Sequence, residues 1–104
     1  MNDLNHPHPG FILKEDVIAP LGLTVGEVAS RLNMSRSSIS RVINGSSAIS
    51  PELAIKLEAA GVSTARFWLA LQRDYDLYKA QAIADSSSIK NIVPLMNDHT
   101  VSGA

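Results

Sequence analysis

Five polar residues between positions 36 and 44 have the side-chain types and the spacing needed to read nucleic acid. They are Arg36, Ser37, Ser40, Arg41 and Asn44. Their spacing of i, i+1, i+4, i+5 and i+8 places all five on one face of a helix. Arginine donates paired hydrogen bonds to guanine, and serine and asparagine hydrogen-bond to bases or phosphates. The pattern therefore indicates a helix whose polar face reads a DNA groove.

The opposite face of this helix carries Ile39, Val42 and Ile43, which we expect to pack on a small core. Ser35 is the predicted N-cap of the helix. Gly45 is suited to end it, because glycine adopts the left-handed conformation that closes many helices. The helix can therefore pack on a core and face a partner at the same time.

A second short helix precedes this one and has capping signals at both ends. Thr24 and Glu27 have the spacing of a capping box, and Asn33 tolerates the left-handed backbone of a helix end. The apolar residues between them follow the spacing i, i+3, i+4, i+7, namely Val25, Val28, Ala29 and Leu32. Residues 24–45 are thus predicted to form two helices joined by a tight turn.

This stretch resembles the helix-turn-helix of the Cro/cI-type repressors. The resemblance rests on Ala29, on the segment Ser35-Arg36-Ser37-Ser38-Ile39-Ser40 and on Asn44-Gly45. It implies base contacts early in the second helix and phosphate contacts around both helices. The DNA-binding residues expected from position are Thr24, Ser35, Arg36, Ser37, Ser40, Arg41, Asn44, Ser46 and Ser47. The alternative is that these arginines and serines only form a solvated surface.

The composition favours one small globular domain. The chain of 104 residues is 45% hydrophobic and has no cysteine, which excludes disulfides and thiol catalysis and fits a reducing cytoplasm. No apolar run approaches the length of a membrane span or a secretory signal, so we expect a cytoplasmic protein without membrane contact. The net charge of −1 argues against a polycation that coats nucleic acid. From Val28 to Pro51, however, there are arginines and no acidic residue, which is a local basic patch.

Three further helices are expected around this motif. Residues 10–19 form the first, broken by Pro20-Leu21-Gly22, and Ser50-Pro51-Glu52 begins the next, which Gly61 ends. The predicted core residues of these two helices are Phe11, Ile12, Val17, Ile18, Leu53, Ile55, Leu57 and Ala60. Ser63 or Thr64 is expected to open the last helix, which covers residues 63–84 and in which Phe67 and Ala70 are expected to face the domain.

The last helix also carries a heptad pattern that indicates dimerisation. Five residues recur at spacings of 3, 4, 3 and 4, namely Trp68, Leu71, Tyr75, Tyr78 and Ala82. A second chain is expected to cover this seam, and the alternative is that Trp68 and Leu71 belong to the core of one chain. The predicted organisation is an N-terminal arm over 1–9, a helix-turn-helix domain over 10–84 and a C-terminal tail over 85–104. Within this tail a linker at Asp85–Ser88 precedes a short extended arm at Ile89–Leu95.

Catalytic and metal-binding patterns were sought and not found in the sequence. His6 and His8 flank a proline, but neither cysteine nor an acidic cluster completes a zinc site with them or with His99. The serines lack a general base at a defined spacing, and Asp74 and Asp76 point to different faces of a helix. We therefore expect no enzyme activity, no cofactor and no metal.

A narrower resemblance covers residues 8–82. His8-Pro9-Gly10, Asn44-Gly45, Ile49-Ser50 and the segment Phe67–Leu77 together resemble HigA-type (VapI-like) antitoxins, although Phe11 replaces the polar residue that usually follows the His-Pro-Gly. The resemblance implies an all-α fold, a compact Cro/cI-type (lambda-repressor-like) domain with a long C-terminal helix. It also implies a homodimer that binds palindromic operator DNA, represses its own operon and neutralises a HigB-type, mRNA-cleaving toxin.

Two rival functions remain open. One is a stand-alone or phage repressor of the same fold, without a toxin partner. The other is a helical adaptor that binds proteins and not DNA.

Overall fold

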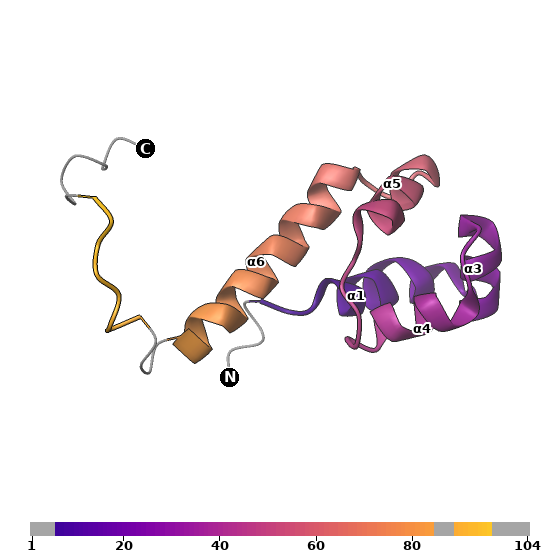
Figure 1. Ribbon diagram of the computed structural model, residues 1–104. Helices are drawn as coiled ribbons and strands as arrows, with labels where there is room; N and C mark the ends of the chain where they lie inside the picture. Colours follow the sequence, from indigo (N-terminus) through magenta and orange to yellow (C-terminus); the bar gives the residue numbers. More distant parts are fainter. Residues whose placement is uncertain (1–5, 85–88, 97–104) are drawn as a thin grey trace.

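The computed structural model describes residues 6–84 and 89–96, and in these residues every regular element is a helix. The elements in chain order are α1 (Pro9–Ile12), η1 (Leu13–Ile18), α2 (Ala19–Leu21), α3 (Val25–Leu32), α4 (Arg36–Ile43), α5 (Pro51–Ala59) and α6 (Ala65–Ala84). The shorter helices gather around one end of α6, whose other end extends away from them (Figure 1). The all-α class and the long last helix predicted from the sequence are confirmed.

The first three elements form one helix that continues past Pro20 and ends within the predicted break Pro20-Leu21-Gly22, at Gly22 and not at Pro20. A proline inside an α-helix clashes with the carbonyl four residues earlier, which here belongs to Asp16. The backbone widens into the π-helical turn η1, where the Ala19 N–H donates to the Lys14 carbonyl five residues earlier. The helix ends at Leu21 because Gly22 adopts a left-handed φ of 68°.

The core is formed by apolar side chains from η1, α3, α4, α5, α6 and the loop before α5. They are Leu13, Ile18, Val28, Ala29, Leu32, Ile39, Val42, Ile43, Ile49, Leu53, Ala54, Leu57 and Trp68. Ile12 and Val17 are partly buried and pack against this cluster, as predicted.

Four core predictions are wrong. Phe11 is 46% exposed and Ile55 is 62% exposed, and Ala60 is exposed at the end of α5. Phe67 is 43% exposed, whereas its neighbour Trp68 is 1% exposed and faces the domain in its place. In α5 the buried residues are Leu53, Ala54 and Leu57, so Ile55 lies off the buried face of that helix.

The N-terminal half of α6 is anchored to the core by polar contacts as well as by Trp68. The Trp68 indole Nε1 donates to the Val62 carbonyl at 2.8 Å. Gln72 is buried, and its Oε1 accepts from the Ile49 N–H at 2.8 Å. Thr64 caps the helix by accepting from the Phe67 N–H at 3.0 Å. Thr64, one of the two residues expected to open the helix, is therefore its N-cap, and the helix runs from Ala65 to Ala84.

His6 and His8, in the N-terminal arm predicted over residues 1–9, pack along α6. The His6 ring stacks on Tyr78 with a centroid distance of 4.4 Å. The His8 ring meets the edge of Tyr75 at 4.9 Å. Two residues of the predicted dimer seam are thus partly covered by the same chain. Residues 1–5 of the arm lie outside the described residues.

The described part of the tail, residues 89–96, begins with a turn in which the Ile92 N–H donates to the Ile89 carbonyl at 3.1 Å. No strand occurs there, and its side chains are exposed. The predicted linker at residues 85–88, the last residues of the tail and His99 lie outside the described residues.

Candidate DNA-binding surface

The helix α3 is fixed at its start by the capping box predicted from the sequence. The Glu27 N–H donates to Thr24 Oγ1 at 3.1 Å, and the Thr24 N–H donates to Glu27 Oε1 at 2.8 Å. This backbone hydrogen bond from Thr24 lowers the pKa of the Glu27 carboxyl, so Glu27 stays ionised. The Thr24 hydroxyl proton remains available to a phosphate.

The turn between α3 and α4 is closed by Asn33 in the left-handed conformation, with a φ of 58°. The Met34 N–H donates to the Ala29 carbonyl at 2.9 Å. From α5, the Lys56 ammonium donates to the Asn33 carbonyl at 3.0 Å. The turn is thus held by hydrogen bonds both to α3, which precedes it, and to α5.

The helix α4 begins at Ser35, whose Oγ accepts from the Ser38 N–H at 3.1 Å. Ile39, Val42 and Ile43 are buried beneath it, as predicted. The opposite face is open, because Arg36, Ser37, Arg41 and Asn44 are exposed and Ser40 is half-buried. The two predicted faces of this helix are therefore both present.

The polar side chains of α4 differ in how free they are to contact a partner. Ser35 Oγ also donates to Ser38 Oγ at 2.7 Å, and the Asn44 amide donates to Ser40 Oγ at 3.4 Å. Arg36 and Arg41 make no ion pair with any residue in the part of the chain that the structure describes. The two guanidinium groups are the most available donors on this face.

The loop after α4 is a compact turn. Gly45 has a φ of 81°, and the N–H groups of Ser46 and Ser47 donate to the Arg41 carbonyl at 2.8 and 3.1 Å. The Ser46 side chain is exposed and that of Ser47 is half-buried. The loop thus brings the predicted phosphate contacts next to the end of the helix that carries Arg41.

The element α1 packs closely against the last turn of α4, which the sequence did not predict. A Cβ atom on Gly10 would lie 1.8 Å from the Val42 carbonyl oxygen, so only glycine fits there. His8 caps α1 by accepting from the Gly10 N–H on Nδ1 at 2.9 Å. The signal that could have found this support is the segment His8-Pro9-Gly10 itself.

The buried position of His8 at the start of α1 determines its protonation state. Burial lowers the pKa of His8, against the opposing effect of the Asp76 carboxylate. The neutral imidazole, which can accept the Gly10 hydrogen bond, is therefore favoured.

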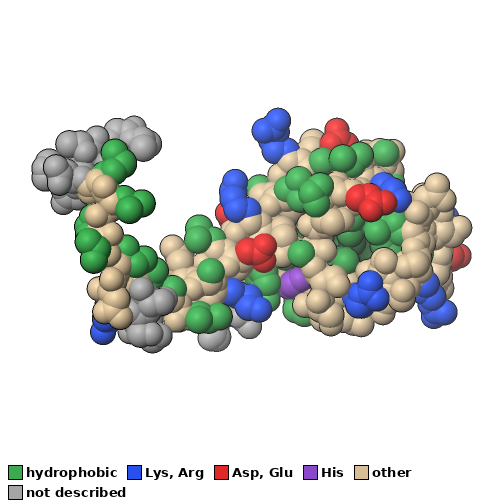
Figure 2. All heavy atoms as spheres, viewed as in Figure 1, with side chains coloured by type: hydrophobic (Ala, Val, Ile, Leu, Met, Phe, Trp, Pro, Cys, Tyr) green, Lys and Arg blue, Asp and Glu red, His purple; other side chains and the backbone are tan. Residues whose placement is uncertain are grey.

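Positive charge gathers where α3 and α4 lie. Figure 2 shows Lys and Arg side chains along the lower edge of that end of the molecule. The sequence between Val28 and Pro51 adds no acidic residue to the surface. Anionic DNA is attracted to such a patch.

Neither a metal cluster nor a membrane helix is found in residues 6–84 and 89–96. No group of three or more His, Cys, Asp or Glu side chains comes together there in a way that could hold a metal ion. No helix among these residues combines the length and the apolar character needed to cross a bilayer.

Comparison with known proteins agrees with this geometry. A helix-turn-helix family model matches residues 13–61. Virulence-associated protein A of Dichelobacter nodosus is 44% identical over 94 residues, which are 88% of this chain and 92% of that protein. Virulence-associated protein I of the same organism is 34% identical over 97 residues, covering 93% and 88%.

A solved structure is similar over nearly the whole chain. It is the antitoxin HigA of Pseudomonas aeruginosa with the higBA promoter, with a TM-score of 0.80 and 27% identity over 88% of this chain and 99% of that one. This chain belongs to the HigA/VapI-like family of Cro/cI-type helix-turn-helix proteins. The family is one of regulators and antitoxins, not a class of enzymes.

The segment of α6 that carried the resemblance to HigA has a structural explanation in this chain. Trp68 and Gln72 attach α6 to the core, and the Gln72 Nε2 donates to Asp76 at 2.9 Å. Tyr75 packs on His8, which in turn caps α1 beneath the loop after α4. The tryptophan, glutamine, tyrosine and aspartate of this HigA-like segment thus connect α6 to the core and, through His8, to α1, which packs against α4.

Proposed function

We propose that this chain is a cytoplasmic, homodimeric regulator that inserts α4 into the major groove of a palindromic operator and that neutralises a HigB-type toxin. One observation carries the DNA part of the proposal. Arg36 and Arg41 are exposed on a helix that is held rigidly from behind, and neither has an ion-pair partner among the described residues. The promoter-bound HigA of Pseudomonas aeruginosa supports it.

We assign the side chains of the surface to two roles. Arg36, Ser37, Ser40 and Arg41 contact base edges, because they lie on the open face early and midway in α4. The phosphate contacts come from the rim of the motif, namely from Thr24, Asn44, Ser46 and Ser47. Ser35 acts through its cap, since its hydroxyl is already hydrogen-bonded to Ser38.

The test of base reading is the substitution Arg36→Ala, with Lys90→Ala as the control outside the patch. The loss of a bidentate contact to guanine weakens operator binding by about 1–3 kcal/mol and relaxes the preference at one base pair. Lys90→Ala leaves the affinity unchanged. An equal loss of affinity for operator and for random DNA would mean that Arg36 contacts a phosphate and not a base.

The homodimer is proposed to form through α6. Of the predicted seam, Trp68 is buried within one chain and is excluded, in agreement with the alternative considered for it. Leu71 packs partly on the core, while Tyr75 and Tyr78 are half-buried and Ala82 is exposed. The remaining seam thus lies along the half of α6 that leaves the core. Two chains paired there would place two α4 helices about 34–36 Å apart, one turn of DNA.

Charge placed in the seam tests the dimer without disturbing the histidine contacts. Ala82→Asp should give a folded monomer in sedimentation and a steep loss of operator affinity, because each half-site then binds alone. Leu77→Asp, an exposed position on another face of α6, is the matched control and should stay dimeric. The reverse result would assign the interface to the face that carries Leu77.

The toxin partner is proposed from the family, supported by the antitoxin name of the solved relative. The chain carries more acidic than basic residues overall, and its arginine patch is local, which leaves other surface for a basic toxin. Co-purification with the product of the neighbouring reading frame tests this. A DNA-blind variant, Arg36→Ala with Arg41→Ala, should still rescue cells. A folded variant that no longer binds toxin would mean that DNA and toxin share one face.

A further inference from the structure

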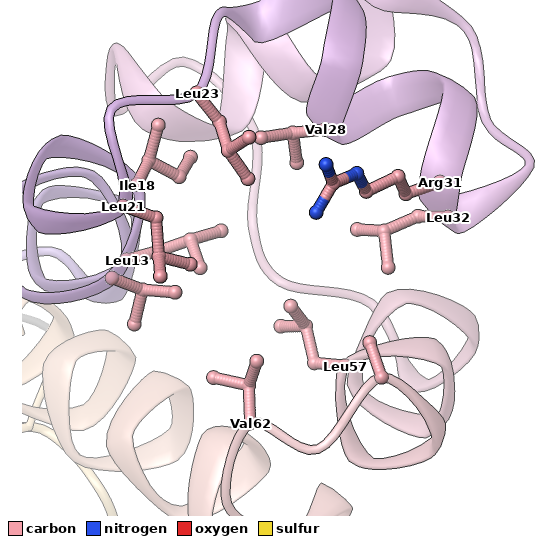
Figure 3. Close-up of a pocket in the computed structure, with 11 residues that line it drawn as sticks. Leu13, Ile18, Leu21, Leu23, Val28, Arg31, Leu32, Leu57 and Val62 are labelled. Carbon is pink, nitrogen blue, oxygen red and sulfur yellow. The ribbon is translucent and has the colours of Figure 1, made fainter.

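A pocket of about 100 Å³ lies on a side of the domain that the DNA-binding proposal does not use. Its walls come from η1 and α2, from α3, and from α5 with the loop after it (Figure 3). No residue of α4 lines it, so occupation of the pocket leaves the proposed DNA surface open.

The lining of the pocket is apolar except at one point. Side chains such as Leu13, Val28, Leu57 and Val62 surround the space, and Arg31 is the one charged residue among those that line it. In Figure 3 the Arg31 guanidinium extends from α3 into the space that the labelled side chains enclose. A cation at the mouth of an apolar pocket matches a ligand that is apolar at one end and anionic at the other.

The Arg31 guanidinium is available to such a ligand. Its natural partner would be Glu27, one turn earlier on α3. That carboxylate is hydrogen-bonded to the Thr24 N–H at 2.8 Å, and no ion pair joins it to Arg31. Arg31 makes no hydrogen bond or ion pair with any described residue. The hydrogen bond from Thr24 and, more weakly, the Arg31 charge lower the pKa of the Glu27 carboxyl. None of the five Arg31 donors is hydrogen-bonded to a described residue, so they are available to a carboxylate.

The π-helical turn η1 is a second feature of this site. It contributes Leu13, Val17 and Ile18 to the lining, with Val17 only half-buried. Turns of the π type occur frequently at functional sites. Pro20 explains why this turn is wide, and three of its six residues line the pocket.

We propose that this pocket binds a small carboxylate with a short alkyl chain. The carboxylate pairs with the Arg31 guanidinium, and the chain fills the space between η1, α3 and α5. A cavity of roughly 150 Å³ admits benzene, so a pocket of this size admits a chain of about four carbons. Bound in this way, the ligand connects the first helix of the helix-turn-helix to α5 and stabilises the folded domain.

The test uses butanoate as the probe, with amide resonances followed by NMR on the full chain. Butanoate at millimolar concentration should shift resonances of residues around the pocket and leave those of α4 in place. Butanamide, of equal shape but uncharged, and acetate, without the chain, should each bind about tenfold more weakly, because each lacks one half of the recognition.

Two substitutions assign the site. Arg31→Gln should weaken butanoate binding about tenfold, the loss expected for a charge-assisted hydrogen bond. Arg36→Gln, which removes an arginine from the DNA surface, should leave it unchanged. Thermal unfolding of both variants checks that each is folded.

Three results would overturn the proposal. One is the absence of any butanoate shift in the folded wild-type chain. Another is equal binding by the wild type and Arg31→Gln. The third is a set of pocket shifts that follows protein concentration and not butanoate, which would mean that a side chain of a second copy fills the space. None of these results bears on DNA binding by α4, which the operator assay tests separately.

Discussion

The helices α4 and α6 are held in the fold in opposite ways. α4 has eight residues, and it is fixed at its start by Ser35, along its underside by Ile39, Val42 and Ile43, and at its end by Gly10. α6 has twenty residues, and among them only Trp68 and Gln72 are buried. The short helix is therefore a rigid platform, and the long helix is anchored at one end.

This difference suits the two roles proposed for them. A side chain that reads a base must be placed precisely, which requires support on every side of its helix except the one that faces DNA. A helix that pairs with a second chain needs firm attachment at one end and an exposed stretch beyond it. In α6 the attached end, which we call the root, contains Trp68 and Gln72. The contrast predicts that substitutions at the root of α6 act on stability, while those beneath α4 act on both stability and DNA binding.

The largest effect is expected at the root of α6. Trp68→Ala removes the most buried aromatic side chain and the hydrogen bond to the Val62 carbonyl, at a cost of about 3–5 kcal/mol in the free energy of unfolding. Phe67→Ala removes an exposed ring that meets Trp68 edge-on, at a cost of about 1 kcal/mol. Urea unfolding measures both. Equal losses would mean that the exposed Phe67 ring anchors the helix as much as the buried Trp68 does.

The next effect is expected beneath α4. Gly10→Ala forces a methyl group against the Val42 carbonyl and should lower the free energy of unfolding by about 2–3 kcal/mol. Because Val42 and the loop after it must move, operator affinity should fall as well. Gly26→Ala, in α3, meets nothing closer than 3.9 Å and should stabilise the chain by about 0.5–1 kcal/mol. A Gly10→Ala variant of normal stability would mean that the packing of α1 against α4 does not contribute to the support of α4.

The parts of the fold that sequence reasoning found are those governed by local chemistry. The caps at Thr24, Ser35 and Ser50 and the left-handed Asn33 each depend on residues three or four positions apart. The two faces of α4 follow from its own repeat. Such features do not depend on what the rest of the chain does, and they are present as expected.

The misplaced residues depend on contacts between distant segments. Phe11 and Phe67 were expected inside because they are apolar, but Trp68 takes the place that Phe67 was given. The heptad pattern predicts that Tyr75 and Tyr78 face a second chain, yet His8 and His6 of the same chain contact them across about seventy residues of sequence. The repeat of apolar residues along a helix does not show that a short polar segment elsewhere in the same chain covers part of that helix.

A moderate effect is expected at Gln72, which connects α6 to the loop before α5. Gln72→Leu leaves the Ile49 N–H without its buried acceptor and should lower the free energy of unfolding by about 1–2 kcal/mol. Gln81→Leu, on the exposed half of the same helix, is the control and should change it by less than about 0.5 kcal/mol. If the two variants had the same free energy of unfolding, apolar packing alone would attach α6 to the core.

The smallest effect is expected from protonation of His8, which joins the two regions. Burial lowers its pKa in the folded chain, so the unfolded chain binds this proton more readily. The stability contributed by neutral His8 is present above its ordinary pKa of about 6.5 and decreases as the pH falls through the lower, folded value. The free energy of unfolding should therefore decrease from pH 7.5 to pH 5.5.

Substitution of the cap separates this effect from other titrations. In His8→Asn the side-chain oxygen still accepts the Gly10 N–H, since asparagine is a favoured N-cap, but it cannot be protonated. The variant should remain folded at pH 7.5 and lose part of the pH dependence, whereas His6→Gln should retain it. An unchanged pH profile in His8→Asn would mean that His8 contributes only packing between α1 and Tyr75. The connection between the DNA-facing loop and α6 would then be insensitive to pH in this range.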